Sequence, residues 1–187
     1  MQDINLIRND IDTYRIVTEI DSLLADITEF KDQICLQGIS KDMDPFYGSR
    51  RIDEMDHKET DFKHFLFPEL DYTNSVIEEL NLFRTRIMRL PKKSCLTYHS
   101  DPTMRVHIPV YTNEQCFLLI ERTAHHLKDD GSVYLCDTTK PHTAINFGEE
   151  DRYHLIIDVK SGPELRKWLV DSSYKYPSDK QSDWYVD

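Results

Sequence analysis

The chain of 187 residues is long enough for one domain with a buried core, and 39% of its residues are hydrophobic. Its formal net charge of −11 argues against a surface for nucleic acid or anionic membranes, because its 23 Lys and Arg residues form no dense cluster. The four cysteines show no Cys-x-x-Cys spacing, the N-terminus lacks a signal-peptide pattern, and no apolar run approaches the ~20 residues that span a bilayer. We therefore expect a cytoplasmic protein without membrane or nucleic-acid partners.

The first part of the chain is predicted to be helical and irregular. Apolar residues at spacings of three and four predict an amphipathic helix at 16–30, and a short strand is expected at 33–37. The region 38–68 is polar and irregular, and a loop of this length in a compact domain is usually functional or disordered. A second short helix is predicted at 74–83.

From residue 85 onward, short β-prone runs alternate with turns. We expect strands at 85–90, 94–99, 105–110, 116–121, 132–135, 143–146 and 153–159. Such a series indicates a sandwich or barrel, and a jelly roll of about eight strands is a standard closure. We predict a single domain over 1–187, mainly β with flanking helices. It would comprise a helical and loop part at 1–84, a jelly-roll core at 85–160, and a C-terminal part at 161–187 with a helix at 163–170.

One tripeptide predicts a metal site. His99 and Asp101 lie in a β-prone run closed by Pro102, so their side chains should project from the same side, with Cα atoms roughly 6.5 to 7 Å apart. His142, which opens the apolar run 143–147, is the best second histidine. Two histidines and a carboxylate are the ligands of O₂-activating Fe(II) enzymes, which keep positions open for a co-substrate and O₂. Alone, a His-x-Asp tripeptide has roughly one chance in ten of binding metal, so the other residues matter.

Two later strands alternate polar and apolar residues. Arg105 shares a strand face with His107, and Arg152 shares one with His154. For an arbitrary sandwich, a solvated outer face is favoured roughly two to one, because charged residues are rarely buried. A ligand-binding cavity instead needs polar groups that point inward, and an arginine fork binds a carboxylate at two points. If the keto acid end of 2-oxoglutarate binds the metal, Arg152, on the strand after the one that His142 opens, can bind the far carboxylate.

Five motifs follow in order: His99-Ser100-Asp101, Arg105-Val106-His107-Ile108-Pro109-Val110 with Thr112-Asn113, Gly131 before Val133-Tyr134-Leu135, Pro141-His142-Thr143-Ala144-Ile145-Asn146, and Arg152-Tyr153-His154-Leu155. Together, residues 94–159 resemble the core of the Fe(II)/2-oxoglutarate-dependent dioxygenases, in particular the aspartyl/asparaginyl β-hydroxylase-like branch that includes bacterial proline cis-4-hydroxylases. The resemblance covers about a third of the chain. It implies a cupin-like double-stranded β-helix, iron ligated by His99, Asp101 and His142, and 2-oxoglutarate bound by Arg152. Arg105 and His107 match positions that line the co-substrate or substrate pocket.

The resemblance also implies a reaction, in which O₂ converts 2-oxoglutarate to succinate and CO₂ while a C–H bond is hydroxylated. A small polar metabolite such as a free amino acid is the expected substrate. The alternatives are a protein Asp or Asn side chain, a cupin-like isomerase or hydrolase, and a non-catalytic metal-binding sensor module. The first 90 residues match no motif and are expected to determine the substrate, while the oligomeric state stays open.

Other residues are assigned structural roles. The adjacent His125 and His126 would point opposite ways on a strand, so a turn or surface role is expected. Cys116 and Cys136 fall in or beside β-prone runs and should be small core residues. Tyr98 is expected to face away from His99 and to pack in the interior.

Overall fold

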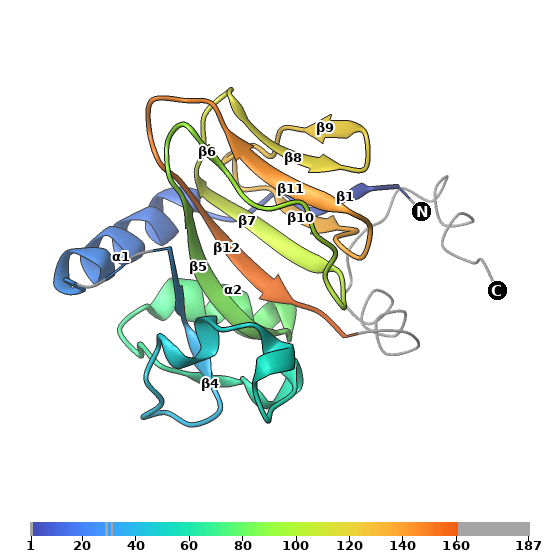
Figure 1. Ribbon diagram of the computed structural model, residues 1–187. Coiled ribbons are helices and arrows are strands. Elements are labelled where there is room, and N and C mark those ends of the chain that lie inside the picture. Colours follow the sequence, from blue (N-terminus) through green and yellow to red (C-terminus); the bar gives the residue numbers. More distant parts are fainter. Residues whose placement is uncertain (1, 29, 31, 161–187) are drawn as a thin grey trace.

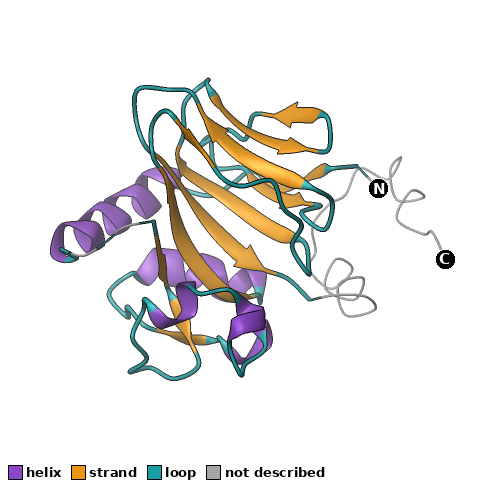
Figure 2. Cartoon of the chain, in the orientation of Figure 1, coloured by secondary structure: helices purple, strands orange, loops and turns teal. Residues whose placement is uncertain are grey.

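The computed structural model describes residues 2–28, 30 and 32–160. The C-terminal part predicted at 161–187, with its helix, therefore lies outside the described residues. Two antiparallel sheets form the body of the molecule, and two helices flank it (Figure 2).

The strands of the two main sheets alternate along the chain. The large sheet has the order β1 (Ile4–Arg8), β10 (Val133–Cys136), β7 (Arg105–Tyr111), β12 (Arg152–Asp158), β5 (Phe83–Leu90) and β2 (Gln33–Cys35). The small sheet has the order β6 (Ser94–Cys95), β11 (His142–Asn146), β8 (Cys116–Ile120) and β9 (Thr123–His125). A separate pair joins β3 (Gln37–Gly38) and β4 (His64–Phe65). From β5 to β8 and from β10 to β12, successive strands change sheet, which is the winding of a double-stranded β-helix and confirms the predicted fold class.

Two α-helices and three short 3₁₀ segments complete the described fold. They are α1 (Thr13–Asp26), η1 (Tyr47–Ser49), η2 (Ile52–Glu54), η3 (Glu59–Asp61) and α2 (Asp71–Leu80). The Asp12 side chain caps α1 by accepting a hydrogen bond from the Arg15 N–H at 3.2 Å. The described helices include none that is long and apolar enough to cross a membrane.

The two faces of the large sheet have opposite character. Its outer face is apolar and packs in one cluster with the buried sides of the helices (Ile16, Ile20, Ile77, Leu80, Ile87, Val106, Ile108, Leu155, Ile157). Figure 1 shows both helices on this side, behind β5, β12 and β7. Because side chains alternate along a strand, the neighbouring positions turn inward, toward the small sheet. Arg105, His107, Arg152 and His154 are all buried, so the solvated-face alternative is wrong.

Both predicted helices have different boundaries in the structure. α1 ends at Asp26 because Ile27 is extended, while Phe30 still packs on the core, which explains the continued apolar spacing. α2 starts at Asp71 and ends before Asn81, whose φ of 50° is left-handed, and this lets the chain turn into β5 at Phe83.

Two predicted strands are shorter in the structure. The strand expected at 33–37 is divided into β2, which pairs with β5, and β3, which pairs with β4. Residue 36, between them, belongs to neither ladder and donates its N–H to the Thr85 carbonyl. Of the strand expected at 94–99, only Ser94–Cys95 belongs to a ladder, and His99 forms an isolated bridge. The edge strands β1 and β9 were not predicted, since short edge strands carry little periodic signal.

Candidate active site

Backbone pairing brings the three predicted metal ligands together. The His99 N–H donates to the His142 carbonyl at 3.0 Å, and the His142 N–H donates to the His99 carbonyl at 2.7 Å. The Asp101 N–H donates to the Thr138 carbonyl at 2.8 Å, which fixes the third residue beside this bridge. As a result, one ligand atom from each of the three side chains lies within 4.8 Å of the other two.

Hydrogen bonds fix the orientation of both histidine rings. His99 Nδ1 lies 2.7 Å from the Thr97 carbonyl oxygen, and His142 Nδ1 lies 3.0 Å from the Lys140 carbonyl oxygen. A carbonyl only accepts, so each Nδ1 carries a proton, and in the neutral ring that a metal requires Nε2 presents the lone pair. His142 Nε2 lies 3.8 Å from Asp101 Oδ2, and His99 Nε2 lies 3.9 Å from Asp101 Oδ1. Two neutral nitrogens and one carboxylate facing a common point fit a divalent transition metal such as iron.

Burial supports this protonation state at His142. Burial lowers the pKa of His142 from its usual 6.5, against the opposing effect of the Lys140 carbonyl. The ring is therefore neutral at neutral pH, as a metal ligand must be. Asp101 has its own partner, because Arg105 Nε lies 3.4 Å from its Oδ2.

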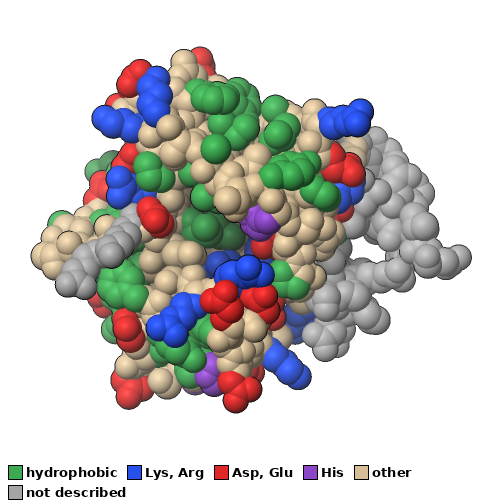
Figure 3. All heavy atoms as spheres, in the orientation of Figure 1, with side chains coloured by type: hydrophobic (Ala, Val, Ile, Leu, Met, Phe, Trp, Pro, Cys, Tyr) green, Lys and Arg blue, Asp and Glu red, His purple; other side chains and the backbone are tan. Residues whose placement is uncertain are grey.

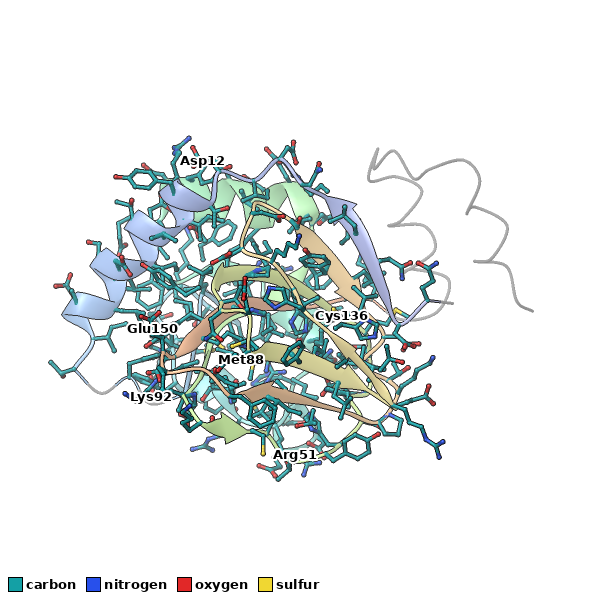
Figure 4. The ribbon with its side chains drawn as sticks, turned by 90° about the horizontal axis from the view of Figure 1, so that it is seen from above. Asp12, Arg51, Met88, Lys92, Cys136 and Glu150 are labelled. Carbon is teal, nitrogen blue, oxygen red and sulfur yellow. The ribbon has the colours of Figure 1, made fainter. Side chains whose placement is uncertain are left out.

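The three residues open into a cavity of about 640 Å³ between the sheets. Its wall is partly apolar (Met88, Leu96, Leu118, Ala144, Ile156) and is completed by the irregular segment 49–53. Figure 3 shows this face of the molecule hollowed near its centre, with basic, acidic and histidine side chains close to the hollow. Seen from above in Figure 4, Met88 lies well inside the molecule and Arg51 near its edge. The segment between β2 and β4 therefore contributes to the site, as its length suggested.

Arg152 is a buried cation to which the described residues offer no acidic partner. Its side chain lines the same cavity at 3% exposure, and its Nε has no hydrogen-bond partner in the described part of the chain. Burial lowers the pKa of Arg152 to about 10, so the guanidinium remains charged at neutral pH. No carboxylate of the described residues lies within ion-pair distance of it. A buried unpaired charge is costly, so this geometry fits an anionic ligand.

His107 and His154 form a neutral pair next to Arg152. Their Nδ1 atoms lie 3.4 Å apart, and burial, reinforced by the Arg152 charge, lowers the pKa of both well below 6.5. One ring must therefore donate its Nδ1 proton to the other. His107 lines the cavity, whereas His154 lies behind it with an unpartnered Nε2.

The sequence interpretation missed a buried ion cluster around Asp158, at the opposite end of β12 from Arg152. Asp158, fully buried, accepts from Arg84 Nη1 at 3.0 Å and Arg86 Nη2 at 2.7 Å, and Arg105 Nε lies 3.2 Å away. Burial opposes the ionisation of Asp158, but the three arginines outweigh it and hold its pKa below the usual range. The signal was present, because Arg84 and Arg86 alternate along β5 as Arg105 and His107 do along β7.

The residues given structural roles mostly behave as expected. Cys116 and Cys136 are buried free thiols, and neither His125 nor His126 lines the cavity. Tyr98 contradicts its prediction, because its side chain is 56% exposed and its hydroxyl donates to the Glu121 carbonyl at 3.1 Å. The chain at residues 96–98 lies outside any ladder, so the two-sided packing assumed for a strand does not apply.

Fold and site together define a class, the double-stranded β-helix proteins with a His-Asp-His donor set at the cavity. The family model of aspartyl/asparaginyl β-hydroxylase matches residues 60–161, more than half of the chain. The chain therefore belongs to the aspartyl/asparaginyl β-hydroxylase family.

Similarity to individual proteins is more limited. An L-proline cis-4-hydroxylase of Rhizobium meliloti (strain 1021) is 30% identical over 106 residues, which are 51% of this chain and 38% of that protein. This chain thus spans well under half the length of that relative. The solved structure of NgTET1 in complex with 5mC DNA has a TM-score of 0.52 at 12% identity, covering 87% of this chain and 74% of that one. A Pseudomonas putida prolyl-4-hydroxylase has a TM-score of 0.47 at 9% identity, covering 86% and 95%. The likeness to NgTET1 supports the fold alone.

Proposed function

We propose that this protein is an Fe(II)- and 2-oxoglutarate-dependent hydroxylase of a small polar metabolite such as a free amino acid. The observation that carries the proposal is the pairing of two features in one cavity. One is the His-Asp-His donor set, whose Nε2 atoms face the Asp101 carboxylate, and the other is a buried arginine with no acidic partner in the described part of the chain. The family assignment and the proline hydroxylase relative support the same chemistry.

His99, Asp101 and His142 would hold the metal. When bound, Fe(II) would supply O₂ activation and a site for chelation of the keto acid. The Thr97 and Lys140 carbonyls keep the Nδ1 protons on the far side of each ring, and Arg105 orients the Asp101 carboxylate.

Arg152 would bind the far carboxylate of 2-oxoglutarate, and His107 would line the same subsite as a neutral ring. The guanidinium fork suits a carboxylate, and its burial makes the interaction strong. Apolar walls from both sheets would keep water from the reacting groups. The balanced reaction is substrate C–H, 2-oxoglutarate and O₂ giving substrate C–OH, succinate and CO₂. One oxygen atom enters each organic product.

Succinate formation tests the proposal. Purified protein with Fe(II), 2-oxoglutarate and O₂ is expected to release succinate, and a screen of amino acids should identify compounds that stimulate the release. Labelling with ¹⁸O₂ should place one label in succinate. We expect His99→Ala or Asp101→Ala to abolish release, because each removes a ligand from the proposed site.

His64→Ala, a histidine on β4 outside the cavity lining, is the matched control and should release succinate at the wild-type rate. Wild-type turnover in both ligand variants would remove the triad from the proposal. Ligand binding without any succinate would instead support the sensor alternative. We also propose, from the charge and composition, a single cytoplasmic domain without nucleic-acid or membrane partners.

A further inference from the structure

The cavity is strongly basic although the chain is acidic. Six arginines line it (Arg50, Arg51, Arg84, Arg86, Arg105, Arg152), against two acidic residues (Asp53, Asp101). The whole chain carries a formal net charge of −11. Concentrating positive charge in a concave surface raises the local concentration of anions. The six arginines exceed the two acidic residues by four charges, and the two carboxylates of one 2-oxoglutarate would offset only two of them.

Most of the other arginines already have partners. Arg84 donates to Asp158 and to the backbone carbonyls of Gly48 and Arg50. Arg105 lies between Asp158 and Asp101, at 3.2 and 3.4 Å from their carboxylate oxygens. At the mouth, Arg51 forms an ion pair with Asp53 at 2.8 Å.

Two arginines retain binding capacity. Arg86 shares the single charge of Asp158 with Arg84 and Arg105, and its buried Nε has no hydrogen-bond partner among the residues that the structure describes. Arg50 is exposed, and the described residues place only the Tyr47 ring near its guanidinium, at 5.6 Å. Three guanidiniums surround Asp158, and only Arg105 also reaches a second carboxylate, that of Asp101. This leaves an excess of positive charge, so an anion beside Arg86 would be favoured.

The sheet register separates Arg86 from the co-substrate arginine. Across the large sheet, Arg86 lies level with Ile156 and His107, whereas Arg152 lies level with Leu90. Four residues along β5 correspond to about 13 Å, so the carboxylate that Arg152 binds lies too far along the sheet to reach Arg86. Arg86 is linked to the segment of Arg50, because Arg84, which shares Asp158 with Arg86, donates to the Arg50 carbonyl.

We propose that the substrate is a small molecule with two anionic groups, one bound by Arg86 near Asp101 and the other by Arg50 at the cavity mouth. The inference rests on the proposed function for the identity of the reaction. Binding of the two anionic groups depends only on Arg86 and Arg50. It narrows the substrate class from polar metabolites in general to diacids such as acidic amino acids.

Matched acid and amide pairs test the charge requirement directly. L-Aspartate with L-asparagine, and L-glutamate with L-glutamine, have nearly equal shapes and differ by one negative charge. In calorimetry without O₂, we expect the acid to bind about tenfold or more tightly than the amide in at least one pair, as a charge-assisted hydrogen bond implies. In the O₂-dependent assay, the same acid should stimulate succinate release more than its amide.

Two variants test which arginine binds which anionic group of the substrate. Arg50→Ala should remove most of the preference for the acid and leave binding of the amide unchanged, since only the second anionic group is affected. Arg86→Met should weaken acid and amide alike by about tenfold or more, because both retain the first carboxylate. Arg122→Ala, an exposed arginine outside the cavity, is the control and should behave as wild type.

Equal binding of acid and amide in both pairs, or no detectable binding of either acid, would overturn the proposal. So would an unchanged acid preference in Arg50→Ala, an exposed position where the substitution leaves the core intact. Calorimetry reads binding without turnover, so these results are separate from a failure to form succinate. Succinate release stimulated by amides alone would keep the proposed function and reject the diacid.

Discussion

At the scale of single residues, the site is defined by groups whose hydrogen-bonding capacity is unused. Both ligand histidines direct Nε2 away from their backbone partners, and Arg152 has a buried Nε without an acceptor in the described structure. Buried polar groups are normally satisfied, so such atoms mark positions where a ligand binds. The same argument marks Arg86 as a ligand-binding position, because its Nε also lacks a partner within the described ranges.

Replacing Arg152 with methionine should separate co-substrate binding from metal binding. We expect Arg152→Met to raise the dissociation constant for 2-oxoglutarate about tenfold to a hundredfold, because a charge-assisted contact is lost. Metal affinity should stay close to wild type, since no ligand changes. Titration of 2-oxoglutarate and of Fe(II) into the anaerobic protein measures both quantities.

Stability gives a second readout for this variant. Because none of the described carboxylates pairs with Arg152, its removal should not lower the free energy of unfolding. Arg122→Met, at an exposed position, is the control. An unchanged 2-oxoglutarate affinity would exclude Arg152 from the proposed role.

At the scale of elements, the decisive feature is which face of the large sheet the helices cover. α1 and α2 pack on the apolar side of β5, β7 and β12, so the polar side faces the small sheet and lines the cavity. Alternation along a strand identifies the two faces, but it does not say which one is enclosed. The same polar pattern would therefore be solvated in a sandwich without the second layer.

The turn before β10 supplies a test at this scale. Gly131 has a φ of +88°, and a Cβ added there would lie 2.5 Å from the Ile11 carbonyl oxygen. The Gly131 carbonyl also accepts the Ile11 N–H at 3.2 Å, which joins the N-terminal segment to the sheet. We expect Gly131→Ala to lower the free energy of unfolding by about 2 kcal/mol, from backbone strain and the close contact.

Urea denaturation measures this effect. The neighbouring Asp130→Ala, in the same turn but exposed, should change stability by less than about 0.5 kcal/mol. Equal stability of the two variants would show that the turn tolerates a side chain.

At the scale of the whole molecule, charge is distributed unevenly between surface and interior. The chain is acidic overall, whereas its cavity and the buried cluster around Asp158 are rich in arginine. The buried histidines add no charge at neutral pH, because burial and the Arg152 charge lower their pKa values. The interior thus depends on His107 and His154 remaining neutral.

This arrangement predicts a loss of stability as the pH falls. Since the native pKa values of His107 and His154 lie well below 6.5, the unfolded chain binds protons below that pH that the folded chain does not. The free energy of unfolding should therefore be greatest above pH 6.5 and should decrease as the pH falls. His107 and His154 contribute up to about 2.7 kcal/mol per pH unit, and His142, whose pKa burial also lowers, adds to this slope. Urea denaturation of the metal-free protein between pH 7.5 and about 5.5 measures the slope.

A substitution in the His107–His154 pair tests whether these rings contribute to the pH dependence of stability. His154→Phe should reduce the slope by up to about 1.4 kcal/mol per pH unit, because one of the titrating groups is lost. A stability that does not change over this range would contradict the inferred neutral state of the two rings.

The sequence by itself determined the β-rich core, most of its strands and the order of the candidate ligands, because these depend on local alternation, turn residues and spacing. The predictions from sequence were wrong where the structure depends on contacts with other segments of the chain. The helix ends, the division of the strand at 33–37 and the exposure of Tyr98 depend on what packs against each segment.

Only the tertiary structure decided which polar face is enclosed, that His99 and His142 are paired by a backbone bridge, and that Arg84 and Arg86 converge on Asp158. These residues are brought together from segments far apart in the sequence. Their burial, charge balance and unused hydrogen-bonding atoms arise from contacts between layers, which periodicity along one strand does not encode.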